Sequence, residues 1–64
     1  MTRFEVIRRE RGVSYTEMAK IFDVHGQTFR TWCRGEHAPH ELRVPQIERI
    51  MGEKIDTLMA EVTP

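Results

Sequence analysis

Apolar residues recur along this chain at helical spacing, in short segments separated by residues that end helices. In the first segment, Phe4 and Ile7 fall on one face of a helix. Thr2 and Glu5 have the spacing of a capping box, and Gly12 is the kind of residue that ends a helix in the left-handed conformation. The pattern predicts a first helix that starts at residue 2 or 3 and ends before Gly12.

The second segment has a clearer beginning. Ser14 and Glu17 form another capping-box pair, so we expect a helix over residues 15–22. Asp23 then interrupts the pattern, and aspartate tolerates the left-handed backbone of a tight turn better than most residues other than glycine. The expected buried face of this helix consists of Met18, Ile21 and Phe22.

The third segment separates its two faces most strongly. We expect a helix over residues 26–34 that ends at Gly35. At about 100° per residue, its apolar side chains gather on one side and its polar side chains on the other. The apolar side comprises Phe29, Trp32 and Cys33, and the polar side comprises Gly26, Gln27, Arg30, Thr31 and Arg34. The apolar side is predicted to be core, which leaves the polar side available to a partner.

The rest of the sequence predicts a loop over residues 35–44 and two further helices. Pro45 favours the first position of a helix that ends at the next glycine, and a last short helix covers residues 54–62. The residues expected to point inward are Ile47, Ile50, Met51, Ile55, Leu58, Met59 and Val62. The sequence thus predicts an all-α, compact five-helix domain over residues 1–64, with a helix-turn-helix at about residues 14–35.

Length and cysteine content limit the classes of protein to consider. A chain of 64 residues has room for one domain with a small core. Cys33 alone cannot form an internal disulfide or a metal site, and it is either a buried apolar residue or a redox-sensitive thiol. No apolar run reaches the ~18 residues of a membrane span, and no signal-peptide pattern opens the sequence. These features predict a cytoplasmic protein with no membrane partner.

The net charge of zero conceals an uneven distribution. Residues 1–34 hold seven Lys or Arg and four Asp or Glu, a net charge of +3, whereas residues 35–64 hold three and six, a net charge of −3. Such a division is typical either of an ordinary solvated surface or of a protein with one face that meets an anion.

No group of residues indicates an enzyme. The sequence has no recognisable general acid–base pair or activated nucleophile, and a domain of this size has little room for a substrate pocket. The spacing of His25, His37 and His40 relative to Cys33 does not fit a zinc finger. We therefore expect no catalytic residue, metal or cofactor.

Residues that match a known family run through almost the whole chain. In the first half they are residues 8–14, Met18, Ala19, Val24, Phe29, Trp32, Arg34 and Gly35, and in the second half residues 44–45, Ile47, 50–52 and 56–59. Over residues 3–60 the sequence resembles the lambda-repressor-like helix-turn-helix family, which includes phage repressors, Cro proteins and bacterial XRE-type regulators. The resemblance implies a transcriptional regulator that binds a palindromic double-stranded DNA operator as a homodimer, in the cytoplasm and nucleoid of a bacterial host cell.

The resemblance also implies which residues contact DNA. Base contacts fall to Gly26, Gln27, Arg30 and Thr31. Phosphate contacts fall to Tyr15, Thr16, His25, Arg34, His40 and Arg43. The Gln27 amide suits adenine and the Arg30 guanidinium suits guanine. For Gly26, a role in the geometry of the helix start is the favoured interpretation.

Several residues depart from the family pattern in and around the turn. Tyr15 stands where the family has a glutamine, and its phenol can donate to a phosphate but is not expected to brace a side chain of the third helix as an amide does. Asp23 replaces a glycine, and His25 and Gly26 replace the usual cap and first base-contacting residue. These departures leave the operator sequence open.

A further departure concerns the core of the domain. Cys33 replaces an acidic residue that commonly pairs with the arginine matching Arg8, so Arg8 is expected to seek another carboxylate such as Glu36. Phe29 and Trp32 suggest either core residues or a stacking platform for single-stranded nucleic acid, and their position on the helix favours core.

Two other functions compete with a repressor that excludes polymerase from a promoter. A helix-turn-helix can bind another protein instead of DNA. A DNA-bound activator would instead contact RNA polymerase through the acidic half, where Glu48, Glu53 and Asp56 are candidates. In a homodimer, the expected apolar contacts are Met59 and Val62.

Overall fold

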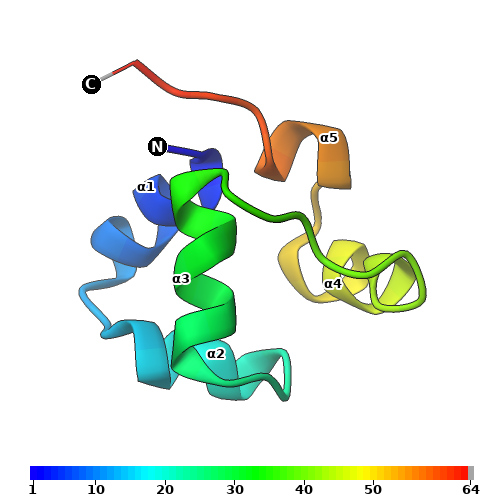
Figure 1. Cartoon of the computed structure of the whole chain (residues 1–64), viewed down its shortest axis with the longest axis horizontal. Helices are drawn as coiled ribbons and strands as arrows, with labels where there is room; N and C mark the ends of the chain where they lie inside the picture. The colour runs from blue at the N-terminus through cyan, green and yellow to red at the C-terminus, as the bar shows by residue number, and fades with distance from the viewer. Residues whose placement is uncertain (64) are drawn as a thin grey trace.

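Five helices make up the part of the chain that the computed structural model describes, residues 1–63. They are α1 (Arg3–Arg11), α2 (Tyr15–Ile21), α3 (Gly26–Arg34), α4 (Val44–Met51) and α5 (Ile55–Leu58). Figure 1 shows α1, α2 and α3 grouped together, with α4 and α5 beside them across the segment that leaves α3. The predicted all-α fold is confirmed, and α2 and α3 form the predicted helix-turn-helix.

The longest helices have nine residues. None of the helices within residues 1–63 is long and apolar enough to cross a membrane.

A cluster of four aromatic rings holds α3 against the rest of the domain. Phe4 of α1 is fully buried, and its ring centroid lies 6.0 Å from that of Phe22, 5.7 Å from that of Phe29 and 5.6 Å from that of Trp32. Edge-to-face and offset rings at these separations attract one another beyond the area they bury. Because Phe29 and Trp32 both come from α3, the cluster fixes which side of α3 faces the core, and the core interpretation of these two rings is confirmed.

The turn between α2 and α3 follows the local signals in the sequence. The Ser14 hydroxyl accepts a hydrogen bond from the backbone N–H of Glu17, which caps α2 as predicted. Asp23 adopts the left-handed conformation with φ of 56°. At Gly26, an added Cβ would lie only 3.0 Å from Thr16 Oγ1 and 3.2 Å from Thr16 Cα. Gly26 therefore allows the start of α3 to approach the start of α2 closely.

The predicted cap at Thr2 is wrong. The side chain of Thr2 makes no capping hydrogen bond to α1; its hydroxyl instead donates to the backbone carbonyl of Trp32 at 2.8 Å. Thr2 is buried, and the last carbonyl groups of a helix lack partners within that helix. The hydroxyl thus satisfies a carbonyl of α3 and ties the first residues of the chain to the end of that helix.

Two apolar residues that were predicted to be buried are exposed. Ile21 is 42% exposed and Ile50 is 38% exposed. Phe22, at the C-terminal cap of α2, and Ile47 of α4 were also predicted to be buried, and both lie in the core. The stripe of apolar residues on each helix is therefore narrower than the sequence suggested.

The last helix is shorter than predicted. It ends at Leu58 because the following backbone bonds to the N-terminal segment: the Arg3 N–H donates to Ala60 O at 3.2 Å, and the Val62 N–H donates to Met1 O at 2.7 Å. An isolated antiparallel bridge joins Thr2 to Glu61. Figure 1 shows the two ends of the chain running near each other beside α1.

The aromatic cluster predicts a large effect of removing one ring. We expect Trp32→Ala to lower the free energy of unfolding by about 3–5 kcal/mol, the usual cost of truncating a buried aromatic side chain. Leu42→Ala is the matched control, since Leu42 is 83% exposed and its loss should change stability by less than ~0.5 kcal/mol. Urea unfolding followed by far-ultraviolet circular dichroism measures both. Equal losses in the two variants would contradict the central role of the cluster.

Candidate nucleic-acid interface

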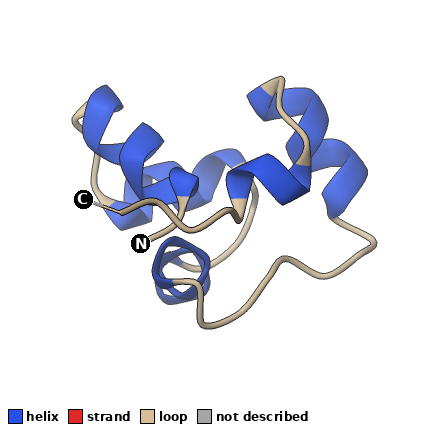
Figure 2. Cartoon of the chain, turned by 90° about the horizontal axis from the view of Figure 1, so that it is seen from above, coloured by secondary structure: helices blue, strands red, loops and turns tan. Residues whose placement is uncertain are grey.

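The face of α3 that points away from the aromatic cluster is polar and accessible. Gln27, Thr28, Arg30 and Arg34 are exposed and Thr31 is half-buried. We call these five residues the outer face of α3. Figure 2 views α3 end-on and shows it at one edge of the molecule, with the segment that leads to α4 passing along the same edge. The predicted separation into a buried and an exposed side is confirmed.

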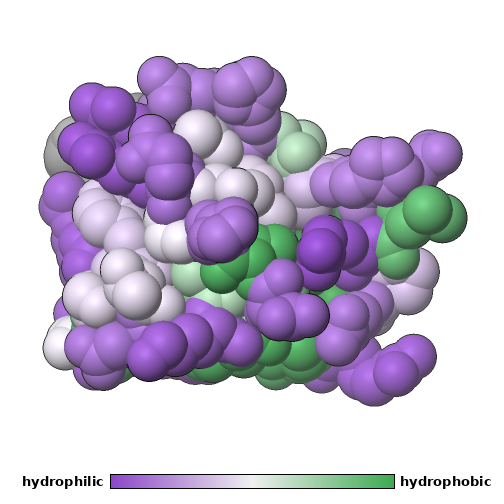
Figure 3. All heavy atoms as spheres, turned by 60° about the horizontal axis from the view of Figure 1, so that its bottom comes forward, coloured by the Kyte–Doolittle hydropathy of each residue, from purple (hydrophilic) through white to green (hydrophobic). Residues whose placement is uncertain are grey.

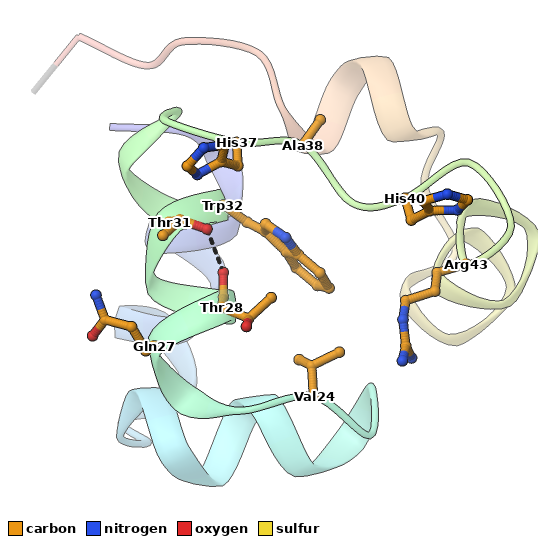
Figure 4. Close-up of a pocket in the computed structure, with 9 residues that line it drawn as sticks. All are labelled: Val24, Gln27, Thr28, Thr31, Trp32, His37, Ala38, His40 and Arg43. Atoms are coloured by element: carbon orange, nitrogen blue, oxygen red, sulfur yellow. Dashed lines mark hydrogen bonds between the residues drawn. The ribbon is translucent and has the colours of Figure 1, made fainter.

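A groove of about 320 Å³ lies between α3 and the segment that follows it. It is lined by Val24, Gln27, Thr28, Thr31, Trp32, His37, Ala38, His40 and Arg43. Figure 4 shows Thr28 and Thr31 on the α3 side of this groove and His40 and Arg43 on the opposite side. The structure thus brings predicted base-contacting residues and predicted phosphate-contacting residues to the walls of one groove.

A second groove, of about 370 Å³, follows the other flank of the outer face. Its lining residues are Met1, Glu5, Arg9, Tyr15, Arg30, Cys33 and Arg34, and we call it the arginine groove. Within residues 1–63, Arg30 and Arg34 form no ion pair or hydrogen bond through their guanidinium groups. These two cations are therefore available to an anion from outside the chain.

The carboxylate of Glu5 is the one acidic group in this groove, and its charge is already compensated. Arg8 binds it with two hydrogen bonds, Nε to Oε1 at 2.9 Å and Nη2 to Oε2 at 3.2 Å. Arg9 Nε and the Tyr15 hydroxyl donate to Oε2 at 3.1 and 3.0 Å. The expectation that Arg8 pairs with a distant acid such as Glu36 is wrong, because Glu5 lies one helical turn away on the same face of α1.

These contacts shift the pKa of Glu5 strongly. The hydrogen bonds from Arg8 lower it most, burial opposes them, and Tyr15 and the charges of Arg8 and Arg9 lower it further, from 4.5 to about 2. The pKa of Tyr15 is raised, first by burial and then by its hydrogen bond to Glu5. Both groups therefore keep their usual charge states throughout the neutral range.

Three residues near the starts of α2 and α3 are predicted to contact phosphate, and they differ in the hydrogen bonds that they already make within the chain. The Tyr15 hydroxyl donates its hydrogen to Glu5, so a phosphate would compete with that carboxylate. Thr16 is exposed beside Gly26. His25 is exposed at the N-terminal cap of α3 and makes no capping hydrogen bond through its side chain. Contact with phosphate stays a prediction for all three.

The predicted phosphate contacts in the segment before α4 have structural roles as well. His40 is exposed, and its Nδ1 accepts a hydrogen bond from the Leu42 N–H at 3.1 Å, so in the neutral ring the hydrogen is on Nε2. Arg43 Nη1 donates to the carbonyl of Phe22 at 3.1 Å and so ties this segment to the end of α2. Arg43 also lines the first groove, on the wall opposite α3.

Sequence reasoning missed two residues of the interface. Thr28 is exposed on the outer face and lines the first groove, and its carbonyl accepts a 2.6 Å hydrogen bond from the Thr31 hydroxyl. Arg9 lines the arginine groove. The position of Arg9, four residues after Glu5 on a helix, is the signal that places the two side chains together.

Cys33 is buried beneath the arginine groove, and this burial is the main reason that the pKa of its thiol rises to about 12. The thiol is therefore protonated and poorly reactive at neutral pH, and the interpretation of Cys33 as a buried apolar residue is confirmed. In the described part of the chain, no group of three or more His, Cys, Asp or Glu side chains is placed to hold a metal ion.

The chain matches no protein-family model, no curated protein and no solved structure. The resemblance to the lambda-repressor-like family stays a prediction from the residues that carry it.

The contacts of Glu5 predict a loss of stability in acid. Because its folded pKa is lowered, the stabilisation is present above pH 4.5 and is lost as the pH falls toward 2. We expect this loss to be on the order of 3 kcal/mol, from a difference of about 2.5 in pKa between the unfolded and folded chain. Urea unfolding at a series of pH values measures it.

Glu5→Gln should remove this part of the pH dependence, whereas Glu10→Gln, an exposed position of the same helix, should retain it. Parallel pH profiles for the wild type and Glu5→Gln would show that the Glu5 contacts are not the source.

Proposed function

We propose that this chain is a sequence-specific double-stranded DNA-binding transcriptional regulator that inserts the outer face of α3 into the major groove. The observation that carries the proposal is that α3 is anchored from behind by buried rings while its exposed side carries an amide, two hydroxyls and two guanidiniums that have no acidic partner within residues 1–63. A helix held in this way by a preceding helix and a short turn is the arrangement that reads base edges in helix-turn-helix proteins.

The chemistry of the outer face suits direct readout. The Gln27 amide can pair with N6 and N7 of adenine, and the Arg30 guanidinium with O6 and N7 of guanine. Thr28 and Thr31 carry methyl groups that suit contact with thymine, and the hydroxyl hydrogen of Thr31 is already used within the helix. In this proposal Gly26 permits the close approach of α2 and does not itself read a base.

The residues on either side of the outer face suit contact with the two phosphate backbones that border the DNA major groove. Arg34 and Arg9 lie along the arginine groove, and Arg43 and His40 lie across the first groove from α3. Thr16 and His25 add exposed donors at the starts of α2 and α3. Contacts of this kind set the register of a protein on DNA without reading its sequence.

A homodimer on a palindromic operator is part of the proposal. Of the two predicted dimer contacts, Met59 packs partly against the core and Val62 is half-buried. Three large apolar side chains are more exposed than these two, namely those of Ile21, Leu42 and Ile50. Figure 3 shows apolar side chains exposed among polar ones on the face that it draws. Apolar surface of this kind suits a subunit contact better than a contact with DNA.

The activator alternative has less support. Glu53 forms an ion pair with Arg3, at 2.6 and 2.9 Å, and Glu48 accepts a hydrogen bond from the Ile55 N–H at 2.7 Å. Of the three acidic candidates, Asp56 alone is exposed, and the other two are half-buried. An apolar outer face on α3 would favour the protein-interaction alternative, and this face is polar and basic.

Binding to DNA should weaken steeply with salt. A dimer that neutralises 6–10 phosphates loses on the order of 10³–10⁵ in affinity between 50 and 200 mM salt, because released counterions drive the association. Fluorescence anisotropy with a labelled duplex measures the slope. A flat response to salt would contradict the proposal and favour binding to a protein.

Arg30 and Arg34 should differ in what their removal does. We expect Arg30→Ala to cost about 1–3 kcal/mol on the preferred operator and to remove the preference at one base pair in each half-site. We expect Arg34→Ala to weaken all duplexes about equally, because a phosphate contact carries no sequence information. The ratio of specific to non-specific affinity separates the two. If this ratio is unchanged in Arg30→Ala and falls to near one in Arg34→Ala, the assignment of Arg30 to a base and Arg34 to a phosphate is reversed.

A further inference from the structure

Two guanidinium groups lie near the ring of Tyr15. Arg8 Cζ lies 4.3 Å from the centroid of the ring, and Arg30 Cζ lies 5.8 Å from it. Both distances fall within the range in which a cation is attracted to the face of an aromatic ring. Arg8 comes from α1, Tyr15 from the first turn of α2 and Arg30 from α3, so these two contacts join all three helices.

The Tyr15 ring is itself held in place at both ends. Its hydroxyl donates to Glu5 Oε2 at 3.0 Å, and its ring centroid lies 6.3 Å from that of Phe29 in the core. Glu5 in turn is fixed by the two hydrogen bonds from Arg8. The ring is thus a rigid surface beside an otherwise exposed arginine side chain.

We propose that Tyr15 is a positioning residue whose ring orients the Arg30 guanidinium for base readout. This inference rests on the proposed function, and it replaces a direct phosphate contact as the main role of Tyr15. A guanidinium held against a ring samples fewer orientations before it binds a base, so less rotamer freedom is lost on binding. Glu5 supports this role because it accepts the hydroxyl hydrogen that a phosphate contact would need.

Two substitutions separate the ring from the hydroxyl. Tyr15→Phe keeps the ring and removes the hydroxyl, whereas Tyr15→Leu removes both. The measured quantity is a ratio of two affinities. One is the affinity for the selected operator, and the other is the affinity for an operator changed at the one base pair where Arg30→Ala removes the sequence preference. A cation–ring contact at an exposed site corresponds to an effect of about 2- to 5-fold.

We expect Tyr15→Leu to lower this ratio about 2- to 5-fold and Tyr15→Phe to leave it near the wild-type value. In the Arg30→Ala background, Tyr15→Leu should have no further effect on the ratio, because the side chain that it positions is gone. Thermal melts of each variant correct the affinities for any unfolded fraction. A loss in Tyr15→Phe that is uniform over all duplexes, with a shallower salt slope, would overturn the proposal in favour of a phosphate contact.

A second measurement tests the contact without DNA. Protons of Arg30 that lie over the Tyr15 ring should resonate upfield in the NMR spectrum, and this shift should persist in Tyr15→Phe and vanish in Tyr15→Leu. An Arg30 spectrum that is the same in Tyr15→Leu and the wild type would overturn the proposal. If the Arg30 shift is present but the wild type binds no duplex, the proposed function fails and the readout role of Tyr15 fails with it, while the ring contact stands.

Discussion

The contact among the rings of Phe4, Phe22, Phe29 and Trp32 is the constraint on which the rest of the structure depends. A chain of 64 residues buries few large side chains, so a single aromatic cluster forms much of its core. The cluster takes one ring from α1, one from the end of α2 and two from α3. It therefore fixes the rotation of α3 about its own axis, and this rotation decides which residues form the outer face.

The buried carboxylate of Glu5 adds a second constraint, which acts on charge. Bringing a carboxylate out of water is costly unless charged partners and hydrogen bonds replace the water, and Arg8, Arg9 and Tyr15 supply both. Arg8 and Arg9 thereby both bind Glu5, although the side chain of Arg9 stays 60% exposed. Arg30 and Arg34 of α3 have no acidic partner among the described residues, so their positive charges are exposed on the outer face of this helix.

Local signals in the sequence were sufficient for α2, α3 and the turn between them. Ser14 at the start of α2, Asp23 in the turn and Gly35 at the end of α3 act through their own backbone or neighbouring residues, and each behaves as its type predicts. The two faces of α3 follow from helical spacing alone. The grouping of base-contacting and phosphate-contacting candidates around α3 was likewise predictable, although their contact with DNA stays a prediction.

What the sequence did not reveal depends on contacts between distant segments. The hydroxyl of Thr2 bonds to the end of α3 rather than to its own helix, and the backbone after Leu58 bonds to the N-terminal segment rather than continuing α5. The contact of Tyr15 with Arg30 likewise needs the relative placement of α2 and α3. Spacing within one helix carries no information about such contacts.

The central claim is that the outer face of α3 binds DNA, and NMR mapping on a bound duplex tests it most directly. A duplex enriched from a random pool by the wild-type protein is added to isotope-labelled protein. The account predicts that the largest shifts fall on Gln27, Thr28, Arg30, Thr31 and Arg34, with smaller shifts along the arginine groove. Failure to enrich any duplex, or shifts confined to α4 and α5, would contradict it.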